Sequence, residues 1–182
     1  PYDTQKVQAQ WLTRGVLETA ASQSIDKMML YELKDAPTAD NGNYSYSGLL
    51  TPSSKPKRSW YHIMTLKNIL GEYSFERRIK NGENSFLVQT RPAGSSNPNA
   101  WVAANEETQL RVYEFKQGSE KIYVIWSPTG NAVAPFEARI TFPSSTLDPT
   151  GGATLHQIKE LSEKGRRWNW TPHVSGQTIN IN

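Results

Sequence analysis

The sequence contains no cysteine, and this absence excludes a disulfide framework and any thiolate-ligated metal site. Export from the cell is not excluded by it. The chain also lacks an apolar stretch of the ~20 residues that a membrane helix needs, so we expect no membrane span. It starts at Pro1 without a charged leader. We therefore expect that either a leader was removed or the chain is a piece of a longer protein.

Several signatures of catalytic chemistry are missing as well. The three histidines, His62, His156 and His173, lack the close spacing that helps to assemble a metal site. The sequence has neither the Gly-x-Ser-x-Gly elbow of serine hydrolases nor the glycine-rich loop that cradles phosphates. We therefore expect no catalytic metal, no cofactor and no nucleotide chemistry.

The net charge is also small, because 17 acidic residues nearly balance 20 basic ones in 182 residues. The pairs Arg77-Arg78 and Arg166-Arg167 are local basic excesses, and interspersed acids favour a solvated surface over a nucleic-acid partner. What the chain does contain is 36% apolar residues with 10% aromatics, enough for the cores of one ordinary domain or two small ones.

Residues 1–72 follow a pattern of helix, strand, loop and helix. Apolar residues spaced three and four apart predict a helix over 4–22, with Asp3 placed to cap it. Residues 27–33 are short and almost continuously apolar, which predicts a strand covered on both faces in a parallel sheet. A polar loop over 34–56 leads to a second helix that follows Pro56 and stops at Gly71. This succession is typical of α/β architecture.

From residue 73 the apolar period changes to two, and short strands alternate with turns. An Asn81-Gly82 hairpin signal joins strands over 73–80 and 85–91. Further strands are predicted over 110–116, 121–127, 136–142, 154–161 and 178–181. Strands at this spacing predict an antiparallel β-sandwich. The domain prediction is therefore 1–72 and 73–182.

The order of several short motifs resembles the end of retaining (β/α)8-barrel glycoside hydrolases. In that family the last barrel strand yields a "YELxD" motif, a loop returns as "GLL", and "KP" opens the last helix. The matching residues here are Tyr31-Glu32-Leu33-Lys34-Asp35, Gly48-Leu49-Leu50 and Lys55-Pro56. The resemblance extends upstream to Gln8-Ala9-Gln10-Trp11-Leu12, and downstream to Lys121-Ile122-Tyr123-Val124-Ile125-Trp126-Ser127 and to Gln177-Thr178-Ile179-Asn180-Ile181-Asn182.

This resemblance implies an α+β composite: the final helix-strand-helix of a βα (TIM) barrel, followed by an antiparallel β-sandwich. Retaining glycosidases use two carboxylic acids, as general acid/base and as nucleophile. In the resembled family these follow the fourth and seventh strands, so the resemblance implies that both lie upstream and that this chain holds no catalytic residue. It also implies a poly- or oligosaccharide substrate, the remainder of the parent barrel as partner, and an extracellular, periplasmic or cell-surface location.

Two acids close the predicted strand, where barrel active sites collect. For Glu32 three roles stay open: a hydrogen bond to a sugar hydroxyl or within the structure, a buried ion pair with a barrel arginine, and catalysis. Asp35 is either a loop or capping acid or a substrate contact. Residues three apart in a strand point to opposite faces, which argues against a catalytic pair.

Aromatic side chains complete the candidate substrate site. Tyr31, Tyr44 and Tyr46 fit the rim of a sugar site, because their rings pack on pyranose C–H surfaces and their hydroxyls hydrogen-bond. Core or loop packing is the alternative for each. Trp168 and Trp170 would share one face of an extended segment, as a glycan platform or as part of a core or domain interface.

Two other hypotheses compete with the enzyme fragment. In the first, residues 73–182 form a non-catalytic carbohydrate- or protein-binding module, or a structural one, against which the front segment docks. In the second, the chain belongs to a cell-surface scaffold descended from the enzyme.

Overall fold

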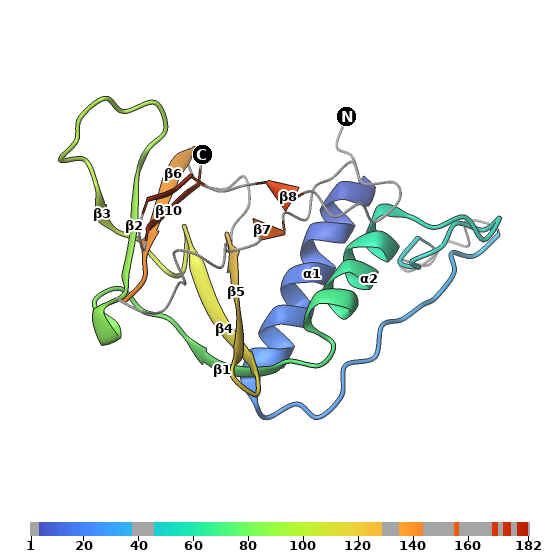
Figure 1. Cartoon of the computed structure of the whole chain (residues 1–182). Helices are drawn as coiled ribbons and strands as arrows, with labels where there is room; N and C mark the ends of the chain where they lie inside the picture. Colours follow the sequence, from blue (N-terminus) through green and yellow to red (C-terminus); the bar gives the residue numbers. More distant parts are fainter. Residues whose placement is uncertain are drawn as a thin grey trace. The chain divides into compact units, whose positions relative to one another are not determined.

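The computed structural model describes residues 4–37, 46–128 and 135–143, together with the strand residues 155–156, 169–170, 173–175 and 178–181. The chain divides into two compact units, and among the described residues the first ends at Ser74 and the second begins at Phe75. Two helices belong to the first unit and antiparallel sheets to the second, so the fold is an α+β mixture (Figure 1). The sequence-based division fell between residues 72 and 73.

Both predicted helices are confirmed, as α1 (Thr4–Ser22) and α2 (Arg58–Leu70). α2 ends at Gly71, whose N–H donates to the Lys67 carbonyl at 2.9 Å. The predicted Asp3 cap lies outside the described residues. Neither described helix combines the length and the apolar character needed to cross a membrane.

The two helices pack side by side and run in the same direction (Figure 1). The Ser59 hydroxyl donates to Gln8 Oε1 at 3.1 Å, and one to two turns further along, Thr13 Oγ1 lies 3.2 Å from His62 Nδ1. Because residue numbers rise together along both helices, the helices are parallel. Parallel neighbours cannot be joined by a tight turn, so residues 23–57 return the chain to the end at which it started.

The prediction of a buried strand over residues 27–33 is wrong for this chain. The segment has no regular secondary structure and forms no strand ladder with any described residue, and its large side chains are exposed. Met29 is 89% exposed, Tyr31 75% and Leu33 60%. A run of apolar residues signals a need for burial, whereas a strand also needs hydrogen-bonding neighbours. Within the described part of the chain, the nearest pairing is the isolated parallel bridge between Lys34 and Leu50.

The second unit contains a three-stranded sheet, a five-stranded sheet and a two-stranded pair. Strand order in the first is β1 (Ser74–Arg78), β4 (Arg111–Gln117), β5 (Glu120–Trp126). In the second it is β3 (Val102–Ala103), β2 (Leu87–Pro92), β6 (Phe136–Thr141), β10 (Thr178–Ile181), β9 (His173–Ser175). The pair joins β7 (Leu155–His156) to β8 (Asn169–Trp170). β4, β5, β6 and β10 confirm predicted strands to within one residue at each end, and β7 covers part of the predicted strand over 154–161.

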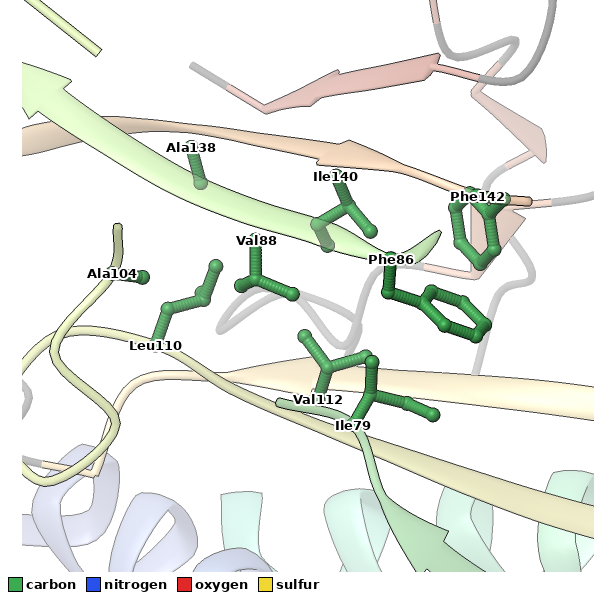
Figure 2. Packing of buried hydrophobic residues seen from close by; sticks show 9 residues of the cluster. All are labelled: Ile79, Phe86, Val88, Ala104, Leu110, Val112, Ala138, Ile140 and Phe142. Carbon is green, nitrogen blue, oxygen red and sulfur yellow. The ribbon is translucent and has the colours of Figure 1, made fainter. Parts of the chain in front are cut away.

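One apolar cluster lies between the three-stranded and five-stranded sheets. Strand alternation turns every second side chain of β2 and β6 toward this cluster, where Ile140 and Val88 meet Val112 of β4. Figure 2 shows these side chains pointing toward one another. Buried members are Ile79, Phe86, Val88, Ala104, Leu110, Val112, Ala138, Ile140 and Phe142.

The Asn81-Gly82 turn does not close the predicted hairpin. Gly82 adopts the left-handed conformation with φ +81°, and a short 3₁₀ helix, η1 (Glu83–Ser85), follows it. β1 and β2 then enter different sheets. The hairpin prediction is wrong because Ile79 and Phe86, on either side of the turn, both contribute to the core between the sheets. The sequence therefore forms the predicted turn, but the two strands that flank it do not pair with each other.

A charged group also lies inside the second unit. Glu114 on β4 is 2% exposed, and its carboxylate lies 3.1 Å from Arg77 Nη2 and 3.3 Å from Lys121 Nζ. Burial opposes the charged form, yet hydrogen bonding and attraction from Arg77 and Lys121 outweigh it and hold the pKa of Glu114 below its ordinary value. Tyr123 is the cross-strand partner of Glu114, and burial raises the pKa of its phenol.

The depressed pKa of Glu114 predicts a specific pH dependence of stability. A lowered folded-state pKa contributes stability above the unfolded pKa, near 4.5, and this contribution is lost as pH falls through the folded value. We expect Glu114→Gln to flatten the loss of unfolding free energy below about pH 4.5, measured by urea titration at several pH values. Glu76→Gln, at an exposed site on β1, is the control and should keep the wild-type slope. Equal acid sensitivity in Glu114→Gln and wild type would contradict this account.

Candidate functional site

The motifs that carry the family resemblance meet in one place in the first unit. The Leu33 carbonyl accepts from the backbone N–H groups of Leu49 and Leu50 at 3.0 and 2.9 Å. Asp35 N–H donates to the Leu50 carbonyl, and Lys57 N–H to the Leu49 carbonyl, both at 2.9 Å. Backbone hydrogen bonds therefore already join the chain segments around residues 33, 49 and 57, before any side-chain contact is considered.

A buried ion pair lies at the centre of this junction. Lys57 Nζ donates to both carboxylate oxygens of Asp35 at 3.1 Å, and the two side chains are only 5% and 6% exposed. The same ammonium donates to the Tyr46 carbonyl at 2.9 Å, while Gly48 N–H donates to Asp35 Oδ1 at 2.9 Å. We call Asp35, Gly48 and Lys57 the clamp. Since burying charge costs free energy unless it is well paired, these extra hydrogen bonds are what make the clamp tolerable.

The position of Gly48 has no room for a side chain. A Cβ at this position would lie 2.5 Å from the Asp35 backbone nitrogen and 2.6 Å from the Lys34 carbonyl carbon. Such approaches are closer than any side chain permits, so only glycine lets the returning loop reach Asp35.

Helix α1 is tied to the clamp by Gln8. Its amide nitrogen donates to the carbonyls of Ser47 and Gly48 at 2.8 and 3.1 Å, and its amide oxygen accepts from Ser59 at the start of α2. Ser59 is fully buried. One side chain thus connects both helices to the loop.

The predicted substrate-binding residues take different positions around the clamp. Asp35 belongs to it, and its carboxylate is engaged within the protein. Tyr31 and Tyr46 have exposed side chains, and Tyr46 contributes its carbonyl to Lys57. Glu32 is half-buried and has no ion-pair partner within the part of the chain that the structure describes. Tyr44 lies outside the described residues.

Sequence reasoning missed Gly48, Lys57 and Gln8 as positioning residues. Gly48 and Gln8 appeared only as members of motifs, Lys57 was not singled out, and the side-chain contacts that join them to the site span 11 to 51 residues in sequence. A usable signal did exist at Lys57, where a lysine directly precedes a helix whose N-terminus disfavours positive charge. Such a placement favours a nearby acid.

Other chemistry has little support in the described residues. They contain no group of three or more histidine or acidic side chains able to hold a metal ion. Of the proposed tryptophan platform, Trp168 lies outside the described residues, and only the backbone of Trp170, in β8, is described. Comparison with protein-family models, with curated proteins and with solved structures finds no match for this chain.

We expect Lys57→Met to lower the unfolding free energy by about 3–5 kcal/mol, because it leaves the Asp35 carboxylate buried without its cation. Urea unfolding followed by far-UV circular dichroism measures the change. Adding Asp35→Asn should recover part of the loss, since the amide oxygen can still accept from Gly48. Lys55→Met, at an exposed neighbour, should change little. If Lys57→Met is as stable as Lys55→Met, the clamp does not hold this unit together.

Gly48→Ala should destabilise the same unit by about 1–3 kcal/mol, because its methyl group must displace backbone atoms of residues 34 and 35. Gly15→Ala is the matched control. Gly15 lies inside α1, and apart from its chain neighbours and the helix's own backbone no atom lies within 4 Å of the place that an alanine methyl group would take, so alanine there should stabilise by roughly 0.5–1 kcal/mol. Opposite shifts in the urea midpoint are expected, and shifts of the same sign would refute the packing argument.

Proposed function

We propose that this chain is the C-terminal part of a secreted, retaining (β/α)8-barrel glycoside hydrolase. It contributes the last barrel strand, one rim of the sugar site and a supporting β-sandwich, whereas the two catalytic glutamates belong to the preceding part of the enzyme. The sequence motifs suggest the family. The geometry of the first unit supports it independently.

The exposed apolar segment over residues 27–33 is the observation that carries the proposal. Met29, Tyr31 and Leu33 are turned to solvent in a segment whose composition suits a strand covered on both faces. The clamp nevertheless fixes the carboxyl end of this segment at Leu33 and Asp35. The segment is therefore held at one end and left without partners, and in a barrel neighbouring strands would supply the backbone partners and the apolar cover that it needs to form a strand.

The parallel helices support the same architecture. In a βα barrel each strand is followed by a helix of the outer ring, so successive helices run parallel with a strand between them. α1, the segment over residues 27–33 and α2 follow each other in this order, and α1 and α2 run in the same direction.

Residues around the clamp would then lie at the end of the barrel where active sites form. Barrel enzymes bind substrate at the carboxyl ends of their strands, which is where Glu32 follows Tyr31. Tyr31 and Tyr46 would offer ring faces to the sugar, and Glu32 would accept hydrogen bonds from sugar hydroxyls or pair with a barrel arginine. The clamp would hold this rim in place without touching substrate.

Hydrogen exchange and product analysis on the longer polypeptide test the proposal. In the 182-residue chain, the amides of residues 27–33 should exchange fast, and in the longer enzyme roughly a hundredfold slower or more, because strand pairing protects them. α2 amides should be protected in both and serve as the control. The longer enzyme should release sugar with retained anomeric configuration, followed by proton NMR, and the 182-residue chain should release none. Unprotected amides in the longer polypeptide, inversion or a lack of hydrolysis would each overturn the assignment.

A binding module is the second candidate, and the separate core of the second unit favours it. In this hypothesis the two sheets act as a sandwich that carries its own ligand site and needs no barrel. The same exchange measurement separates the candidates, because a module predicts equally exposed amides over 27–33 in the longer chain.

A further inference from the structure

On the outward face of the five-stranded sheet, a tryptophan ring contacts two arginine guanidinium groups. The guanidinium carbons of Arg139 and Arg91 lie 4.4 and 4.7 Å from the centroid of the Trp101 ring. Strand alternation explains the meeting, because Ala138 and Ile140 enter the core and Arg139 therefore points outward. Extending the β2–β3 register by one residue sets Trp101 opposite Arg91. We call Trp101, Arg91 and Arg139 the platform.

Hydrogen bonds fix the platform before any ligand arrives. Arg91 Nε donates to Glu137 Oε2 at 2.6 Å, and the Gly94 N–H donates to Glu137 Oε1 at 3.0 Å. Arg139 donates to Gln89 Oε1 at 2.6 and 3.2 Å through two nitrogens. The loop that delivers Trp101 is thereby tied at its start to the strand that supplies Arg139. A site held in this way loses little conformational entropy on binding.

Charge on the platform is not balanced. Glu137 neutralises Arg91, whereas the partner of Arg139 among the described residues is the neutral amide of Gln89. Both guanidinium groups lie beside the Trp101 ring on the outward side of the sheet. The Trp101 side chain is partly exposed. Arg91 Nε and Nη2 both lie 2.6 Å from Glu137 Oε2, whereas Glu137 Oε1 accepts from the Gly94 N–H and keeps a lone pair for a further donor.

We propose that the platform binds an acidic oligosaccharide, with a pyranose ring on the indole and a uronate carboxylate on Arg139. An indole face packs on the C–H surface of a sugar, and a guanidinium pairs with a carboxylate through two parallel hydrogen bonds. Sugar hydroxyls would donate to Glu137. A single uncompensated positive charge suits one carboxylate better than the repeating phosphates of a nucleic acid.

This site lies wholly in the second unit and goes beyond the proposed enzyme function. Its failure would leave the exposed segment over 27–33 and the hydrolase assignment untouched. The hydrolase assignment can likewise fail while the platform binds.

Titration of the full 182-residue chain, followed by the NMR signals of the tryptophan indole N–H groups, tests the proposal. Trp101→Phe assigns the signal of Trp101. We expect tetragalacturonate to bind and shift this signal, and maltotetraose to bind at least tenfold more weakly. Added salt should lower the affinity for tetragalacturonate. Trp101→Ala and Arg139→Gln should each reduce affinity for tetragalacturonate by roughly tenfold or more, because each removes one of the two contacts.

Trp11→Ala is the matched control, since Trp11 is an exposed tryptophan that has a single arginine, Arg14, over its ring among the described residues. It should leave binding unchanged. Arg139→Lys keeps the positive charge but removes the planar guanidinium group, so we expect an affinity between those of the wild type and Arg139→Gln. This comparison tests the proposal if Trp101→Ala does not fold. Equal binding of maltotetraose, binding that survives both substitutions, a shift with a single-stranded oligonucleotide only, or no shift at all would each overturn the proposal.

Discussion

The first unit depends on one buried ion pair, that of Asp35 with Lys57. Neither charge has access to bulk water, so each needs the other, and the remaining hydrogen-bonding capacity is met by Gly48 and the Tyr46 carbonyl. The pair connects the end of the segment over residues 27–33 to the start of α2. The ion pair contributes more to the geometry of the unit than to its free energy of unfolding, because a well-packed apolar pair can give equal stability. What an apolar pair would not fix is the direction of the loop.

The second unit solves a similar problem with Glu114. Its carboxylate is buried between cations on neighbouring strands, while the apolar cluster fills the space between the sheets. Both units therefore bury a carboxylate with a basic partner, and in both the acid follows or lies within a predicted strand. The difference is what surrounds it: Glu114 lies in a sheet with paired neighbours, and Asp35 follows a segment without them.

Local patterns predicted the elements well and the contacts between them poorly. The helices and most strands follow from apolar spacing, and Gly118 with its left-handed φ of +57° marks the turn between β4 and β5. The Asn81-Gly82 signal gave the turn but not the pairing, because the core decides which sheet each strand joins. Residues 27–33 show the same limit, since composition indicates a need for burial but not the presence of partners. The clamp and the platform depend on residues far apart in sequence, which periodicity does not reveal.

The clamp has a further consequence for how this region can change. Asp35 and Tyr46 are both held by Lys57, so the two ends of the intervening stretch keep their positions whatever its sequence. The clamp thereby separates two properties of this region. The positions of Asp35 and Tyr46 are set by contacts with Lys57 and not by the residues between them.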